Sequence, residues 1–171
     1  MDEILDEFRN ESKGLVSEML EILEEVEGQF DHRFLLENFG QVVDRIMGGA
    51  KNLELAYEEN ENIRKIAKYS ELCKLVGYKT SQIDNPDLFT VSVALLLDAT
   101  EMLDDLVEKF GTDKEIDVSQ ILSSTFLDRL SWVAGKFDEN LRASVAVNKD
   151  KKDGKSQDQI DDLLKSLGIL G

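Results

Sequence analysis

The chain has 171 residues, which suffices for one well-buried domain and falls short of two ordinary ones. Its 36 acidic and 20 basic residues give a formal net charge of −16. This charge argues against nucleic acid and anionic membranes as partners, because both bind positively charged surfaces. One cysteine and one histidine cannot supply an internal disulfide or a zinc site. With an acidic N-terminus and no apolar run of about 18 residues, we expect a soluble cytoplasmic protein.

Apolar residues recur at helical spacing along most of the chain, and a single proline with few aromatic residues also favours helices. The pattern predicts an all-α protein with helices over about 2–28, 32 into the fifties, 60–78, 87–110 and 118–144. Asp31 is placed to cap the second helix, and Pro86 to begin the fourth. We expect Cys73 and Trp132 to lie in the core.

The chain changes character after Val147. Residues 148–155, "NKDKKDGK", contain no apolar residue and four lysines, which predicts a flexible solvated linker. Residues 156–171 show a short amphipathic helix with apolar positions at Ile160, Leu163, Leu164 and Leu167. A helix this short is only marginally stable alone in water, so it either docks on its own bundle or folds on a partner. The residues themselves leave both alternatives open.

The predicted second helix, "LLENFGQVVDRIMGGAKNL", carries two adjacent glycines, each costing a helix about 1 kcal/mol relative to alanine. At about 100° per residue, one stripe of this helix is mostly apolar: Leu35, Phe39, Val42, Ile46, Gly49 and Leu53. The opposite stripe consists of Glu37, Gln41, Asp44, Gly48 and Lys51. We expect Gly49 to allow close packing inside and Gly48 to open an outer docking face. A solvated polar face with a tolerated glycine is the alternative.

The stretch "VVDRIMGGAKNL" resembles the active helix of histidine phosphotransfer (HPt) domains, above all that of the chemotaxis kinase CheA, which reads roughly F-R-x-x-H-T-L-K-G-S-A. Helix order and lengths resemble this family over about residues 1–110. The resemblance implies an HPt-like antiparallel helical bundle of about five helices, which we expect over residues 1–147. Asp44 stands where the family has its phosphate-accepting histidine, and Met47 replaces the usual lysine. Phosphate relay is therefore not implied, and His32 precedes the helix.

The overlapping stretch "ENFGQVVDRIM" is similar to the catalytic helix of CheZ, the family of phosphatases that act on the chemotaxis response regulator CheY. Glu37 matches an acidic position that is aspartate in CheZ, and Gln41 matches the catalytic glutamine. The C-terminal "SQDQIDDLLKSLGIL" resembles the receiver-binding peptide that ends CheZ proteins. Together they imply dephosphorylation of a CheY-like receiver, with Gln41 orienting the water and Glu37 contacting the receiver's lysine. The chain itself would bind no metal or cofactor, and Mg²⁺ is expected in the receiver.

We expect receiver docking to involve Asp44, Gly48 and Lys51 on the helix, where Asp44 either contacts the receiver or repels phosphate and only marks a lost acceptor. The tail would hold the receiver through an apolar and a polar set of residues, namely Ile160, Leu163, Leu164 and Leu167, and Gln157, Asp158, Asp161 and Asp162.

Two other functions stay open. One is a non-catalytic pseudo-HPt module that binds or sequesters response regulators in chemotaxis signalling. The other is a structural bundle whose tail docks on itself or on a signalling partner. CheZ is a homodimer, but a five-helix bundle can close its own core, so the sequence does not decide between monomer and homodimer.

Overall fold

The computed structural model describes residues 2–110, 115–137 and 156–169, which form α-helices and short 3₁₀ helices without any strand. The predicted linker 148–155 and residues 138–147 lie outside the described residues. None of the described helices is both long and apolar enough to cross a membrane. The elements are α1 (Glu3–Val26), η1 (Phe30–Leu35), α2 (Leu36–Ala56), α3 (Glu61–Thr80), α4 (Pro86–Lys109), η2 (Val118–Gln120), α5 (Ser124–Lys136) and α6 (Ser156–Ser166).

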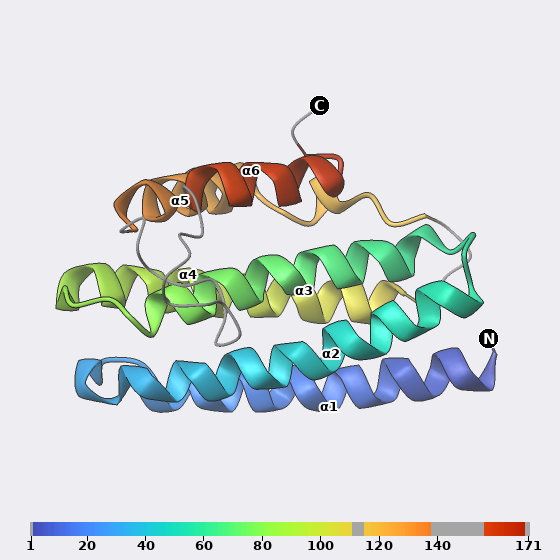
Figure 1. The fold of residues 1–171 in the computed structure, drawn as a ribbon, viewed down its shortest axis with the longest axis horizontal. Coiled ribbons are helices and arrows are strands. Elements are labelled where there is room, and N and C mark those ends of the chain that lie inside the picture. Colours follow the sequence, from blue (N-terminus) through green and yellow to red (C-terminus); the bar gives the residue numbers. More distant parts are fainter. Residues whose placement is uncertain (1, 111–114, 138–155, 170–171) are drawn as a thin grey trace, which may run out of the picture.

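The first four α-helices form an antiparallel bundle in which each packs on the next and α4 closes the ring against α1 (Figure 1). Above this ring, α5 packs on α4 and α6 packs on α3, and the two also contact each other. The expectation of an all-α antiparallel bundle is therefore confirmed for the described residues. The tertiary packing also brings the C-terminal helix α6 onto the outer side of α3.

One apolar core runs through all of these helices, because each turns a stripe of aliphatic and aromatic residues inward. The rings of Phe8 and Phe110 meet edge to face with centroids 5.4 Å apart. Tyr69 is fully buried and donates its hydroxyl hydrogen to the carbonyl of Ala99 over 2.7 Å, which satisfies its polar atom and joins α3 to α4.

Side chains of asparagine and serine cap three of the helices. Asn60 accepts from the first amides of α3, Asn85 from those of α4, and Ser123 from that of Phe126 in α5. Pro86 begins α4, as predicted. Asp31 does not cap the second helix, because it lies inside η1 and α2 begins after this 3₁₀ turn without a side-chain cap.

The fifth predicted helix is shorter than expected, since α5 begins at Ser124 and ends at Lys136. Cys73 is buried at 1% exposure, which confirms the expected core position. The prediction for Trp132 is wrong: its side chain is 51% exposed on α5. The reason is the position of α5, which among the described elements packs mainly on α4 and α6 and leaves Trp132 on an open side.

The close approach of α2 and α3 depends on glycines other than the adjacent pair. A Cβ at Gly40 would overlap the ring of Tyr78, and a Cβ at Gly77 would lie 2.6 Å from Phe39 Cδ1. Each helix thus offers a glycine to an aromatic ring of the other. This packing turns α2 further toward α3 than the predicted stripe, so that the buried residues are Leu36, Phe39, Gly40, Val43, Ile46, Met47 and Ala50.

The adjacent glycines lie in the two environments that the sequence predicts, one packed and one exposed. A Cβ at Gly49 would lie 3.2 Å from the ring of Phe8, so Gly49 accommodates close packing against α1. Gly48 is exposed, and nothing lies within 4 Å of the position its Cβ would take. Leu35, Val42 and Leu53 of the predicted inner stripe are only half-buried, which reflects the rotation of the helix toward α3.

Candidate functional site

The predicted docking residues lie along one edge of α2. Glu37, Gln41, Gly48 and Lys51 are exposed, and Asp44 is half-buried. They follow one another at intervals of four or three residues, so each lies about one turn further along the same side. No described residue hydrogen-bonds to the Gln41 amide, which leaves its donor and its acceptor available to a partner.

Two residues of α3 form the floor beside this edge. Lys74 Nζ lies 2.5 Å from Asp44 Oδ1, and it also lies 5.9 Å from the centroid of the Tyr78 ring. Tyr78 is only 4% exposed because its ring occupies the space that Gly40 leaves open. Gly40 directly precedes Gln41, so the exposed amide follows the residue at which α2 contacts Tyr78 of α3.

The carboxylates of this edge influence the pKa of Tyr78. Burial raises the pKa of Tyr78, and the carboxylates of Asp44 and Glu37 raise it further. The phenol is therefore protonated at neutral pH. The two carboxylates lie on either side of Gln41 in the sequence, so the edge presents an amide between two carboxylates.

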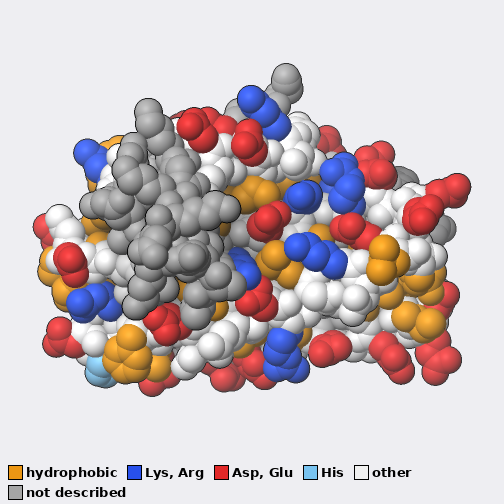
Figure 2. All heavy atoms as spheres, in the orientation of Figure 1, with side chains coloured by type: hydrophobic (Ala, Val, Ile, Leu, Met, Phe, Trp, Pro, Cys, Tyr) orange, Lys and Arg blue, Asp and Glu red, His pale blue; other side chains and the backbone are white. Residues whose placement is uncertain are grey.

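A groove of about 520 Å³ opens where α2 and α3 meet α6. Lys51, Lys68 and Lys74 line it from the bundle. Lys68 lies 3.7 Å from Glu71 and Lys74 pairs with Asp44, whereas Lys51 has no acidic partner among the described residues. Figure 2 shows Lys and Arg side chains gathering where α6 borders α3. The groove thus brings three lysines of the bundle beside the carboxylates of Glu71 and Asp162, next to the predicted docking face.

The tail helix α6 forms the other wall of this groove through Gln159, Asp162, Leu163 and Ser166. Its apolar side chains are all buried: Ile160, Leu163, Leu164 and Leu167. Of its polar residues, Asp158 and Asp162 are exposed, and half-buried Asp161 accepts a hydrogen bond of 2.9 Å from Gln157 Nε2. In this structure the tail therefore docks on its own bundle, one of the two alternatives that the sequence left open.

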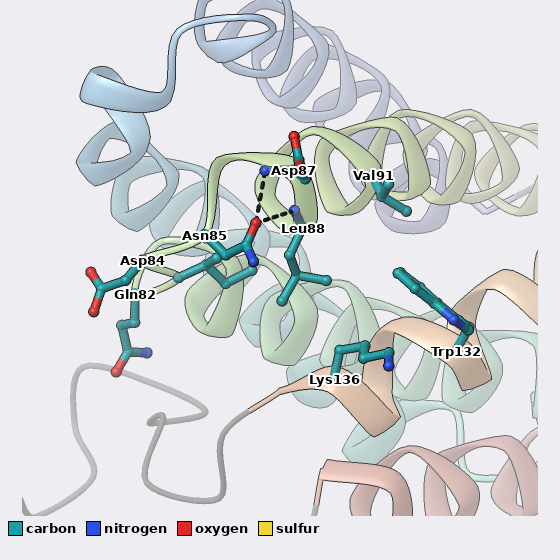
Figure 3. A pocket seen from close by; sticks show the side chains of 9 residues that line it. Gln82, Asp84, Asn85, Asp87, Leu88, Val91, Trp132 and Lys136 are labelled. Atoms are coloured by element: carbon teal, nitrogen blue, oxygen red, sulfur yellow. Dashed lines mark hydrogen bonds between the residues drawn. The ribbon is translucent and has the colours of Figure 1, made fainter.

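A second cavity of about 630 Å³ lies between the start of α4 and α5. Trp132 and Lys136 project from α5 toward the side of α4 that carries Leu88 and Val91 (Figure 3). The Lys136 ammonium lies 5.4 Å from the centroid of the Trp132 ring. Asn85, at the rim, uses its side chain to cap α4. The cavity thus has an apolar wall, and its polar side chains are partly engaged in the fold.

The described residues contain few groups for covalent or metal chemistry. No group of three or more His, Cys, Asp or Glu side chains among them is placed to hold a metal ion. Burial raises the pKa of the Cys73 thiol to about 12, so this cysteine is not a nucleophile at neutral pH. His32 is exposed in η1, apart from the α2 edge. The amide of Gln41, between the carboxylates of Glu37 and Asp44, can position a water or a partner's group, and an amide is not a nucleophile toward phosphate.

Sequence reasoning missed the α3 side of this site. Lys74 and Tyr78 lie in a helix that the pattern assigned entirely to packing, and nothing in the sequence links them to Asp44 or Gln41. Gly40 could have been noticed, because it stands beside Gln41 in the middle of a predicted helix. Its partner Gly77 also lies inside a helix, directly before Tyr78.

Comparisons with known proteins give no relative: no protein-family model, no curated protein and no solved structure matches the chain significantly.

Proposed function

We propose that this protein dephosphorylates a CheY-like response regulator. The observation that carries the proposal is the pairing of Glu37 and Gln41, both exposed and one turn apart on α2, with no described residue hydrogen-bonded to the Gln41 amide. The similarity of this helix and of the C-terminal peptide to CheZ supports the same reaction. The antiparallel ring of α1 to α4 supports an HPt-like bundle as the scaffold.

The proposed reaction requires only a few groups from this chain. The aspartyl phosphate of a receiver is held by the receiver's own lysine and Mg²⁺, so the chain has only to position a water. The Gln41 carbonyl accepts a hydrogen from this water, and its N–H donates to a phosphoryl oxygen. The water oxygen bonds to phosphorus as the bond from phosphorus to the receiver's carboxylate oxygen breaks. Inorganic phosphate is released, the receiver's aspartate regains its free carboxylate, and the water's proton passes to solvent.

The other residues of the edge orient the receiver. Glu37, one turn before Gln41, pairs with the receiver's lysine and sets the docking angle. Gly48 gives the receiver's loops access to the helix, since nothing lies within 4 Å of its Cβ position. Lys51, which has no acidic partner among the described residues, offers a cation to the acidic surface around the phosphorylated aspartate. Asp44 is held by Lys74, so we assign it to shaping the edge.

The test is the decay of a phosphorylated CheY-type receiver with Mg²⁺ present. We expect catalytic amounts of the protein to accelerate the decay, and Gln41→Ala to reduce the acceleration about 100-fold or more. Asn38→Ala is the matched control, because Asn38 is exposed on the same helix and has no proposed role. An equal effect of both variants, or no effect of either, would show that Gln41 does not position the water.

A second candidate is a pseudo-HPt module that binds receivers without hydrolysing their phosphate. It is favoured by the position that HPt domains use for histidine, which Asp44 occupies here in an ion pair with Lys74. Receiver binding without accelerated decay in the same assay would support this candidate and overturn the phosphatase.

A further inference from the structure

The tail helix α6 is docked along its whole apolar face. Ile160 is fully buried, and Leu163, Leu164 and Leu167 are at most 9% exposed, all within the core that α3 and α5 share. An amphipathic helix of this length gains most of its stability from such packing. The groove between α3 and α5 is therefore occupied by a segment of the same chain.

The C-terminal end of α6 is closed by its own backbone. Gly168 adopts a φ of 82°, and its N–H donates to the Lys165 carbonyl over 3.0 Å. The N–H of Ile169 donates to the Leu164 carbonyl over 2.9 Å, and Ile169 packs against the core. This Schellman arrangement satisfies carbonyls that the last turn leaves free and turns the chain back onto the bundle.

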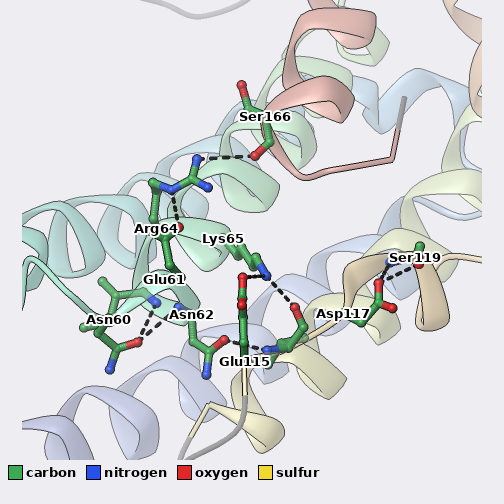
Figure 4. Close-up of polar contacts among 11 residues, drawn as sticks. Asn60, Glu61, Asn62, Arg64, Lys65, Glu115, Asp117, Ser119 and Ser166 are labelled. Atoms are coloured by element: carbon green, nitrogen blue, oxygen red, sulfur yellow. Dashed lines mark hydrogen bonds and ion pairs between the residues drawn. The ribbon is translucent and has the colours of Figure 1, made fainter. Parts of the chain in front are cut away.

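Polar contacts hold α6 at both ends. Arg64 of α3 donates from Nη1 to the Ser166 carbonyl over 3.3 Å, as Figure 4 shows. At the other end, the Ser131 hydroxyl of α5 donates to Gln157 Oε1 over 3.5 Å. The exposed Asp162 lines the same groove as Lys51, Lys68 and Lys74, so a carboxylate of α6 lies on a groove that carries lysines of the bundle.

We infer that the groove between α3 and α5 is a docking site for α6 and that it competes with the receiver for Ile160, Leu163, Leu164 and Leu167. The inference rests on the proposed function, in which these same side chains bind the receiver. An apolar face that is buried in the bundle cannot be buried in a partner at the same time. The receiver can therefore bind the tail only in chains in which α6 has left the groove. Its apparent affinity is the intrinsic affinity multiplied by the fraction of such chains.

Release of α6 would also change the α2 edge, because α6 forms one wall of the lysine groove beside Lys51 and Lys74. A receiver that captures α6 removes Asp162 from this wall and leaves the lysines facing the incoming acidic surface. Binding of the tail by the receiver and exposure of the lysine groove are thus coupled through one movement of α6.

Hydrogen exchange on the full chain without any receiver tests the docking. We expect the backbone amides of residues 160–167 to exchange at least about 10-fold more slowly than in a synthetic peptide of residues 156–169. Exchange at the rate of the peptide would overturn the inference. Arg64→Ala should accelerate exchange in α6, whereas Glu61→Gln is the matched control, because it removes only the Glu61 partner of Arg64 at 2.9 Å.

A covalent lock tests the competition. Ser131→Cys with Gln157→Cys, joined by a short bis-maleimide, fixes α6 on α5, and the buried Cys73 thiol does not react. We expect the locked chain to bind a CheY-type receiver at least about 10-fold more weakly than the same variant before linking. The single variant Gln157→Cys, treated with the same reagent, controls for the modification. Equal affinity of the locked and open chains would overturn the competition.

The two measurements separate this inference from the proposed function. If neither the locked nor the open chain binds a receiver, the proposed function and the competition both fall, while the exchange rates still decide whether α6 occupies the groove. If the open chain binds and hydrolyses but the lock changes nothing, the phosphatase stands and the competition is overturned.

Discussion

Lys74 of α3 forms an ion pair with Asp44 of α2, with 2.5 Å between Nζ and Oδ1, beside the exposed edge that carries Gln41. The Asp44 side chain is 44% exposed and that of Lys74 is 20% exposed, so water screens the pair and its net contribution to stability is small. The pair engages Asp44 within the protein, whereas Gln41 and Glu37 of the same edge form no such pair with a described residue.

The first prediction concerns this pair. We expect Asp44→Asn to lower the free energy of unfolding by less than about 1 kcal/mol and to leave turnover of phosphorylated receiver within about 3-fold of the parent. Chemical denaturation and the decay assay measure the two quantities. A loss of turnover as large as that of Gln41→Ala would mean that Asp44 contacts the reacting groups directly.

The second prediction compares two glycines of α2. Gly40→Ala places a methyl group into the Tyr78 ring, and we expect it to lower the free energy of unfolding by about 1–3 kcal/mol. Gly48→Ala meets open space, so the better helix propensity of alanine should raise stability by up to about 1 kcal/mol. Urea denaturation of both variants measures these two changes in the free energy of unfolding. If Gly40→Ala were the more stable of the two variants, α2 and α3 would pack less closely at Gly40 than the contact with Tyr78 indicates.

The third prediction uses Gly48 to test the docking face. Gly48→Gln should keep or improve the stability of the helix, while its long side chain covers the edge between Asp44 and Lys51. We expect a weaker affinity for the phosphorylated receiver, by about 10-fold or more, in titration experiments. Asn38→Gln serves as the control at an exposed position of α2 outside this row. An unchanged affinity would exclude Gly48 from the interface.

The fourth prediction concerns the tail. Deletion of residues 156–171 removes the four apolar side chains that are proposed to bind the receiver. We expect the KM for phosphorylated receiver to rise and kcat at saturation to stay within about 2-fold, because the α2 edge performs the chemistry. Steady-state kinetics on the truncated chain decide the matter. An unchanged KM would remove the tail from the mechanism.

The fifth prediction is a loss of stability in alkali. Burial raises the pKa of Cys73 from its ordinary value of 9.0 to about 12, so between these values the folded state binds more protons than the unfolded state. The contribution of the Cys73 thiol to the free energy of unfolding is therefore fully present below pH 9. It falls as the pH rises toward 12, by about 1.4 kcal/mol per pH unit. Buried Tyr69, whose pKa is also raised by burial, adds to the loss above pH 10.

Urea denaturation at pH 7.5, 9 and 10 measures this dependence. Cys73→Ala leaves a cavity and lowers stability at every pH, but it should flatten the decline between pH 9 and 10. A decline of equal slope in the variant would assign the pH dependence to other groups.

Some features of this protein follow from the sequence alone, because they depend on short-range order. Helical spacing of apolar residues predicted α1 to α4 and α6, and the exposed side of α2 with Glu37 and Gln41 follows from the period of the helix. The separate roles of Gly48 and Gly49 follow from the same period, since neighbouring residues point in different directions.

Only the tertiary structure decided which residues of different helices contact one another. The contacts of Gly40 with Tyr78, of Gly77 with Phe39 and of Asp44 with Lys74 join α2 to α3, and no local pattern predicts which residues face one another. The exposure of Trp132 depends on how much of α5 its neighbours cover. The place of α6 was open for the same reason: an amphipathic helix shows that its apolar face needs a partner, and only packing selects the groove between α3 and α5.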